Sequence, residues 1–201
     1  MDSDKTINWR RLRPGLTLVE LQIAALIFGG IALLIGGIYF SYTRLFNEDR
    51  TSIQVASENR IALDEITNQI RESPGVVINC TICGLSTTSS STVLIIKLWP
   101  LGANGETFEP TSGEYDYVVY RLNPSNSTSL IKEIFPNGIN SSRIQTSKIL
   151  APNTKTILFT YDNPQDMAAS AQVTVTLTIE AKSLTKTYTV NQSSKSVLRN
   201  K

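Results

Sequence analysis

The stretch Arg13-Pro14-Gly15-Leu16-Thr17-Leu18-Val19-Glu20-Leu21 decides how this chain is organised. A basic leader ends at Gly15, and an apolar run begins at once and continues to Phe40. That run contains one charged residue, Glu20, close to its start. Burying a carboxylate in a bilayer costs about 2.5 kcal/mol or more. The position of Glu20 inside an apolar run therefore suggests that its carboxylate has a specific role.

This junction resembles the class III signal of type IV prepilins and type II secretion pseudopilins. The resemblance implies that a prepilin peptidase cuts between Gly15 and Leu16 and that Leu16 is then N-methylated. It also implies that Glu20 pairs with the freed Leu16 amine of a neighbouring subunit, which would offset much of the cost of burying the charge. The family prefers phenylalanine directly after the cut, where this chain has Leu16.

Plainer interpretations of the same residues stay open. Gly15 also fits an ordinary turn at a membrane edge after Pro14. Glu20 also fits a carboxylate at the level of the lipid headgroups, with the true span beginning at Leu21.

Composition limits the classes of function. The 201 residues are 41% hydrophobic and 18% charged, with a formal net charge of +2. The leader contains the charged residues Asp2, Asp4, Lys5, Arg10, Arg11 and Arg13. These account for the whole net charge, so the remaining chain is neutral and has no bulk electrostatic reason to bind nucleic acid. Histidine is absent, which removes the commonest general base and transition-metal ligand. We expect no enzyme activity, no cofactor and no metal.

The apolar run predicts a single membrane span. It covers about 24 residues, which is enough to cross a bilayer and too long for the apolar core of a secretory signal peptide. Lysine and arginine precede it, whereas mixed charges follow it, so the amino terminus is expected in the cytoplasm and the head outside. The expected location is the cytoplasmic membrane and later, by the resemblance, a pilus or pseudopilus fibre.

No proline lies between Pro14 and Pro74, which predicts one long helix from Leu16 to about Glu72. The predicted segments are a leader (1–15), the transmembrane half of the helix (16–40), its amphipathic half (41–73) and a β-rich extracytoplasmic head (74–201).

Each half of the predicted helix has a face of its own. Ala25, Gly29, Ala32 and Gly36 form a stripe of small residues, which permits close helix packing but also fits ordinary glycine frequency in membrane helices. The distal half has an apolar stripe. Asn59 and Arg60 interrupt this stripe, and Val55 and Ile61 lie outside it. Its members are Ile53, Ala56, Leu63, Ile66 and Ile70.

After Val76 the pattern favours strands. They are predicted at Val76–Asn79, Thr92–Leu98, Tyr115–Leu122, Ser129–Phe135, Thr156–Tyr161, Gln172–Ala181 and Thr185–Gln192. Strict alternation over Gln172–Ile179 indicates a half-buried antiparallel strand, and the short turn after it predicts a hairpin. The predicted fold class is α+β, with a long N-terminal helix packed on an antiparallel β-rich head.

Two further features have competing interpretations. Cys80 and Cys83 are expected to form a short-range disulfide if the head lies outside the cytoplasm, with two free thiols or a redox motif as alternatives. Asp162, Asn163 and Asp166 share one loop, which fits a solvated turn better than a calcium site.

The resulting hypothesis is a minor subunit of a type IV pilus or type II secretion pseudopilus. By resemblance it is most like a J-type minor pseudopilin or a W-type minor pilin, a likeness that the ending Leu198-Arg199-Asn200 extends weakly. The implied partners are other pilin or pseudopilin subunits, the prepilin peptidase and the inner-membrane assembly platform. The alternatives are a single-pass anchored binding or sensing module, an adhesin, or a competence pseudopilin for DNA uptake.

Overall fold

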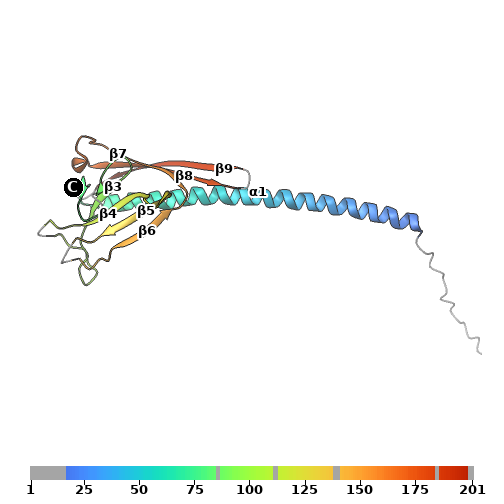
Figure 1. Cartoon of the computed structure of the whole chain (residues 1–201), viewed down its shortest axis with the longest axis horizontal. Helices are drawn as coiled ribbons and strands as arrows, with labels where there is room; N and C mark the ends of the chain where they lie inside the picture. The colour runs from blue at the N-terminus through green and yellow to red at the C-terminus, as the bar shows by residue number, and fades with distance from the viewer. Residues whose placement is uncertain (1–16, 85–86, 111–112, 138–140, 184–185, 199–201) are drawn as a thin grey trace, which may run out of the picture. The chain divides into compact units, whose positions relative to one another are not determined.

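The computed structural model describes residues 17–84, 87–110, 113–137, 141–183 and 186–198. The chain divides into two compact units, residues 1–46 and 47–201. One uninterrupted helix, α1 (Leu18–Glu72), contributes to both units (Figure 1). It ends where the sequence predicts, before Ser73 and Pro74, and the Ser73 amide donates to the carbonyl of Ile70 at 3.2 Å.

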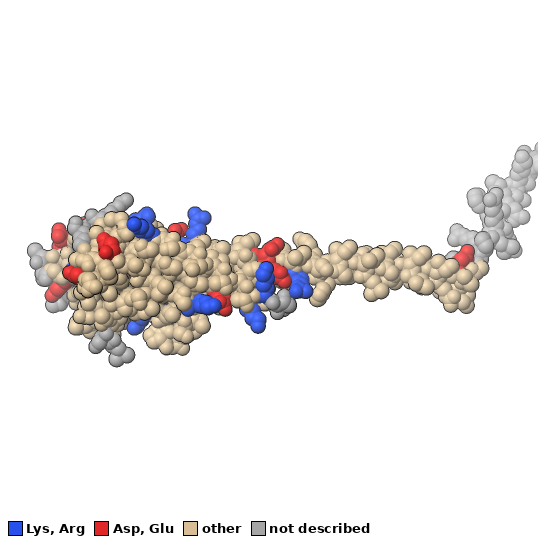
Figure 2. Space-filling model, turned by 90° about the horizontal axis from the view of Figure 1, so that it is seen from above, with Lys and Arg blue, Asp and Glu red and all other residues tan. Residues whose placement is uncertain are grey.

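The first unit consists, in its described part, of the apolar half of α1. Its large hydrophobic side chains, from Leu18 to Phe46, are exposed. Figure 2 shows this part of the helix as a tan surface with one acidic residue near its start. Among the described residues, α1 is the one helix long and apolar enough to cross a membrane.

The second unit contains the β structure, and its sheets are antiparallel. A four-stranded sheet has the order β3 (Leu94–Leu98), β4 (Asp116–Asn123), β5 (Asn126–Phe135), β6 (Thr146–Ala151). A three-stranded sheet has the order β7 (Thr154–Tyr161), β8 (Gln172–Lys182), β9 (Thr187–Val197). The short strands β1 (Asn79–Cys80) and β2 (Thr87–Thr88) pair with each other, and η1 (Met167–Ala169) is a 3-10 turn. The predicted α+β class is confirmed.

The main core joins the distal half of α1 to both larger sheets. The buried helix residues are Val55, Asn59, Ala62, Leu63, Ile66, Thr67 and Ile70. The predicted stripe is therefore right at Leu63, Ile66 and Ile70 but wrong at its start. Ile53 is 69% exposed, whereas Val55 and Asn59 are buried. The buried face turned out to include a polar residue, because Asn59 finds hydrogen-bond partners on β8 and β9.

The hairpin predicted from alternation is confirmed. The four apolar residues of the alternating stretch are all buried, namely Val173, Val175, Leu177 and Ile179. β8 pairs with β9 along its whole length, from Gln172 opposite Val197 to Lys182 opposite Thr187.

One strand prediction was wrong, and one strand of six residues was missed. Val76–Asn79 is not a strand, because Val76 makes a single bridge to Ile96 and pairing resumes only at β1. β6 was missed by the sequence analysis. It lies at the edge of its sheet and is exposed over most of its length, so it has no alternating apolar pattern to reveal it.

Strand β9 runs along α1 and contacts it at three levels. The contacts are Tyr188 Oη to Glu48 Oε2 (3.4 Å), Asn59 Nδ2 to the carbonyl of Val190 (3.0 Å) and Ser196 Oγ to the carbonyl of Thr67 (2.9 Å). These contacts hold the helix against the hairpin along most of the length of β9.

Candidate functional site

The first candidate region is the start of α1, where Thr17 and Glu20 cap the helix. The Thr17 amide and hydroxyl both donate to Glu20 Oε2, at 2.9 and 3.0 Å, and the Glu20 amide donates to Thr17 Oγ1 at 3.3 Å. This reciprocal pattern is a capping box, which satisfies amides that a helix start leaves without partners. The Thr-x-x-Glu spacing is typical of this motif, but the sequence analysis considered Glu20 only as an assembly residue or as a carboxylate at the headgroup level. Gly15 and Leu16, the predicted cleavage and methylation residues, lie outside the described residues.

The small-residue stripe lies on the exposed helix. Ala25 and Ala32 are exposed, and a Cβ built on Gly29 or Gly36 would meet nothing within 4 Å. These positions therefore leave room for another helix to approach closely.

Cys80 and Cys83 are joined by a disulfide. Both cysteines are buried, and with Ile95, Val119 and Phe135 they form a second, smaller core. Their segment covers the face of the four-stranded sheet that α1 does not cover. Burial of both sulfurs inside a core favours a structural role for this disulfide over a redox role.

The Asp162 loop is held together by its own backbone. Asp162 accepts from the amides of Asn163 and Ala171, and Asp166 accepts from those of Ala168 and Ala169. Desolvation raises the pKa of Asp162, but these hydrogen bonds outweigh it and leave the pKa below its ordinary value. In the described part of the chain, no group of three acidic or cysteine residues is placed to hold a metal. The arrangement is that of a capped turn.

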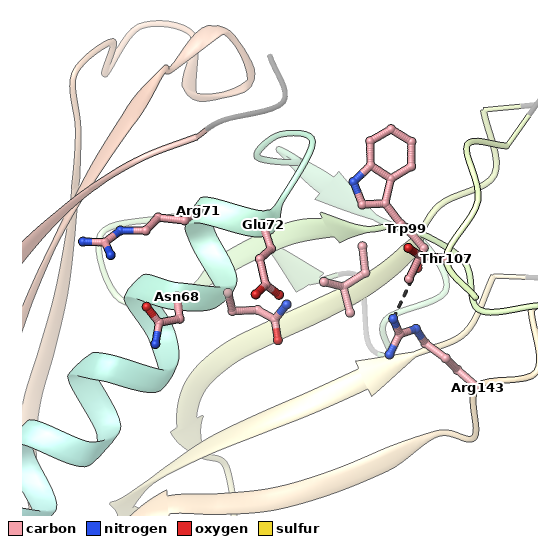
Figure 3. Close-up of a pocket in the computed structure, with 8 residues that line it drawn as sticks. Asn68, Arg71, Glu72, Trp99, Thr107 and Arg143 are labelled. Carbon is pink, nitrogen blue, oxygen red and sulfur yellow. Dashed lines mark hydrogen bonds between the residues drawn. The ribbon is translucent and has the colours of Figure 1, made fainter. Parts of the chain in front are cut away.

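A cleft in the second unit is a candidate site that the sequence analysis missed. It has a volume of about 630 Å³ and lies between the last turn of α1 and the segment that follows β3. Its lining residues are Asn68, Gln69, Arg71, Glu72, Leu98, Trp99, Thr107 and Arg143. In Figure 3 the Glu72 carboxylate points between the two walls, Arg143 reaches in from the opposite wall and Arg71 extends away.

Arg143 is fixed in the cleft wall by a buried carboxylate. Its Nε lies 3.1 Å from Oδ2 of the fully buried Asp116, and its Nη2 donates to the carbonyl of Trp99 at 3.3 Å. The Nε–H is not aligned for a hydrogen bond, so the contact with Asp116 is an ion pair. Asp116 also accepts from the Asn137 amide at 3.0 Å and from Ser141 Oγ at 2.6 Å.

No sequence pattern marks this cleft. Trp99 and Arg143 are 44 residues apart, and β4 and β5 lie between them in the chain. They come together because the segment between β5 and β6 reaches the segment after β3, where Ser142 donates hydrogen bonds to the carbonyls of Leu101 and Gly102.

At the carboxyl end of the chain, Leu198 is buried and its amide donates to the carbonyl of Ala171 at 2.9 Å. Arg199 and Asn200 lie outside the described residues. Comparisons with protein-family models, with curated proteins and with solved structures give no match for this chain.

Proposed function

We propose that this protein is a minor subunit of a type IV pilus or type II secretion pseudopilus. The observation that carries the proposal is the Arg13–Leu21 junction, whose last four residues begin a 55-residue helix. The first half of that helix exposes its apolar side chains, whereas its second half packs on a β-rich unit. A helix of this kind has one half suited to lipid or to other helices and one half committed to its own head.

In this proposal the apolar half anchors the subunit in the cytoplasmic membrane, with its amino terminus in the cytoplasm. A prepilin peptidase removes residues 1–15, and the assembly platform moves the subunit into a fibre. There the same apolar half packs among the helices of other subunits, with the small residues at the contact. The protein acts mechanically and performs no catalysis of its own.

Glu20 has two roles in this scheme. Its Oε2 caps its own helix through Thr17. A carboxylate accepts several hydrogen bonds at once, so it can also receive the freed Leu16 amine of a neighbouring subunit. Charge pairing in a low-dielectric fibre core would then set the register between subunits.

The decisive measurement is the intact mass of the protein isolated from its native host. The expected mass is that of residues 16–201 plus one methyl group. A Gly15→Val variant is the control, because a β-branched side chain obstructs access to the scissile carbonyl, and it should keep the leader. A native protein that retains the Arg10–Arg13 segment would overturn the proposal.

The cleft beside Arg143 favours a second candidate, a single-pass anchored binding module. That protein would keep Met1 and need no cut after Gly15. The same mass measurement therefore separates the two candidates.

A further inference from the structure

We propose that the cleft between the end of α1 and Trp99 binds an oligosaccharide. The site belongs wholly to the second unit, and the inference does not depend on the pilin proposal. Its volume of about 630 Å³ falls in the range that small-molecule ligands occupy.

The hydrogen-bonding groups of the cleft suit hydroxyl groups. One wall supplies the amides of Asn68 and Gln69 and the carboxylate of Glu72, and the other supplies the hydroxyl of Thr107 and the guanidinium of Arg143. Planar amide, carboxylate and guanidinium groups present donors and acceptors in fixed pairs. Neighbouring hydroxyls on a sugar ring both donate and accept, so one ligand can satisfy both walls.

Arg143 is already oriented for this role. Asp116 and the Trp99 carbonyl hold its Nε and Nη2. A side chain fixed before binding loses little conformational entropy when the ligand arrives. The buried Asp116 carboxylate balances the positive charge of Arg143. Arg143 is therefore suited to donate directed hydrogen bonds, and it attracts anions only weakly.

Trp99 lies at the rim of the cleft, where its indole ring projects to one side of the polar groups (Figure 3). Leu98 is the other large apolar residue of the lining. The Trp99 ring is half-buried and meets the Tyr115 ring edge-on, with centroids 5.6 Å apart. The ammonium of Lys97 lies 4.9 Å from the centroid of the same Tyr115 ring. An indole held this way offers a rigid face to the C–H groups of a sugar ring.

Other ligand classes fit less well. A lipid or drug-like ligand needs a mainly apolar lining, whereas five of the eight lining side chains here are the polar groups named above. A strongly charged ligand would meet both Glu72 and Arg143, which have opposite charges.

The chain provides its own fluorescent reporter, because its two tryptophans are Trp9 and Trp99. The test uses the full-length Trp9→Phe protein in lauryldimethylamine oxide, a detergent without a sugar headgroup. Chitotetraose, an N-acetylated glycan, and maltotetraose, a neutral glucan, are titrated while Trp99 emission and heat are recorded. Triglycine serves as a ligand that is not a saccharide. We expect saturable binding of at least one oligosaccharide with a Kd of about 1 mM or tighter.

Variants locate the binding. Glu72→Gln, Asn68→Ala and Thr107→Ala should each weaken it, and Trp99→Ala, followed by calorimetry, should weaken it by about tenfold or more. Asn191→Ala on the exposed face of β9 is the matched control and should bind like the parent protein. If Trp99→Ala does not fold, the other three variants, at the exposed residues Glu72, Asn68 and Thr107, show whether the oligosaccharide binds in the cleft.

The glycan that binds more tightly identifies the class of natural ligand. A preference for chitotetraose indicates a cell-wall-like glycan, and a preference for maltotetraose indicates a glucan. Absence of saturable binding to both would overturn the proposal. So would binding that the cleft variants leave unchanged, or binding of triglycine alone.

Discussion

The side-chain amide of Asn59 donates from Nδ2 to the carbonyl oxygen of Leu177, at 3.0 Å, across 118 residues of sequence. The same Nδ2 donates to the carbonyl of Val190, also at 3.0 Å. One buried side chain on α1 is thus bonded to both strands of the β8–β9 hairpin. Because the two carbonyls lie at defined positions along the strands, Asn59 fixes where the helix sits on the hairpin.

Replacing Asn59 by alanine should destabilise the second unit by about 2 kcal/mol, because one buried and one partly buried hydrogen bond are lost at about 1 kcal/mol each. Urea unfolding of the full chain, followed by circular dichroism, measures the change. Arg60→Ala is the control, since its side chain is 81% exposed. Equal stability of the two variants would show that the two hydrogen bonds of Asn59 do not stabilise the fold.

A second prediction concerns pH and Glu65, which joins α1 to β5 and β6. Its carboxylate lies 3.0 Å from Lys132 Nζ and 3.1 Å from Lys148 Nζ. Burial raises the pKa of Glu65, but hydrogen bonds and charge from both lysines outweigh it, so the pKa lies below the ordinary 4.5. A carboxylate with a lowered folded-state pKa stabilises the fold above its unfolded value and loses that contribution as the pH falls through the folded one.

We therefore expect Glu65→Gln to be less stable than the parent near neutral pH and the difference to shrink well below pH 4.5. Urea midpoints across this range measure it. The neighbouring Asp64→Asn is the control, because its carboxylate is 67% exposed and its contact with Arg60 is long, at 3.8 Å. A Glu65→Gln difference that does not vary with pH would contradict the assignment.

The third prediction concerns the disulfide. Alkylation of the native protein without reductant should leave Cys80 and Cys83 unmodified. The double variant Cys80→Ala, Cys83→Ala should lose about 2 kcal/mol, since the closed loop is short and the chain-entropy effect is small. Peptide mapping and urea unfolding provide the measurements, with the exposed Thr81→Ala as control. Two fully alkylated thiols would show that the native pair is reduced.

The fourth prediction separates the two roles of Glu20. Glu20→Gln keeps an oxygen that can accept from Thr17 but removes the charge, whereas Thr17→Ala removes the cap hydroxyl and keeps the charge. If Glu20 pairs with the Leu16 amine of a neighbour, Glu20→Gln should be processed normally yet enter fibres poorly. An unpaired buried amine costs about 3 kcal/mol or more, whereas a lost cap costs about 1 kcal/mol.

The readout is the amount of each variant in sheared-fibre and membrane fractions. Thr17→Ala should assemble nearly as well as the parent. The reverse result, with Thr17→Ala excluded from fibres and Glu20→Gln incorporated, would mean that Glu20 acts only as a helix cap.

Sequence patterns predicted the parts of this fold that repeat with a clear period. The proline-free stretch predicted α1, and strict alternation predicted β8 and its hairpin. The same logic failed where the environment was mixed. Asn59 interrupted the apolar stripe and was taken as a gap, although its hydrogen bonds to two strands allow its burial. Strand β6 lies at an edge and shows too little burial to be visible.

The cleft was beyond sequence reasoning for a different reason. Asp116 begins β4, and Ser141 and Arg143 return to it from the segment that follows β5. A contact of that kind depends on tertiary pairing, which one sequence does not reveal. The capping box was within reach, because Thr17 and Glu20 stand at its characteristic spacing.

The alignment of β9 with α1 has a mechanical consequence. Contacts at Glu48, Asn59 and Thr67 lie at successive levels along the helix. A force that pulls on the helix along its axis loads these contacts in shear, all at the same time. If the force instead acted perpendicular to the helix axis at one end, these contacts would break one after another under a smaller force. Tension along the helix is thus shared by the whole length of the hairpin before any single hydrogen bond has to yield.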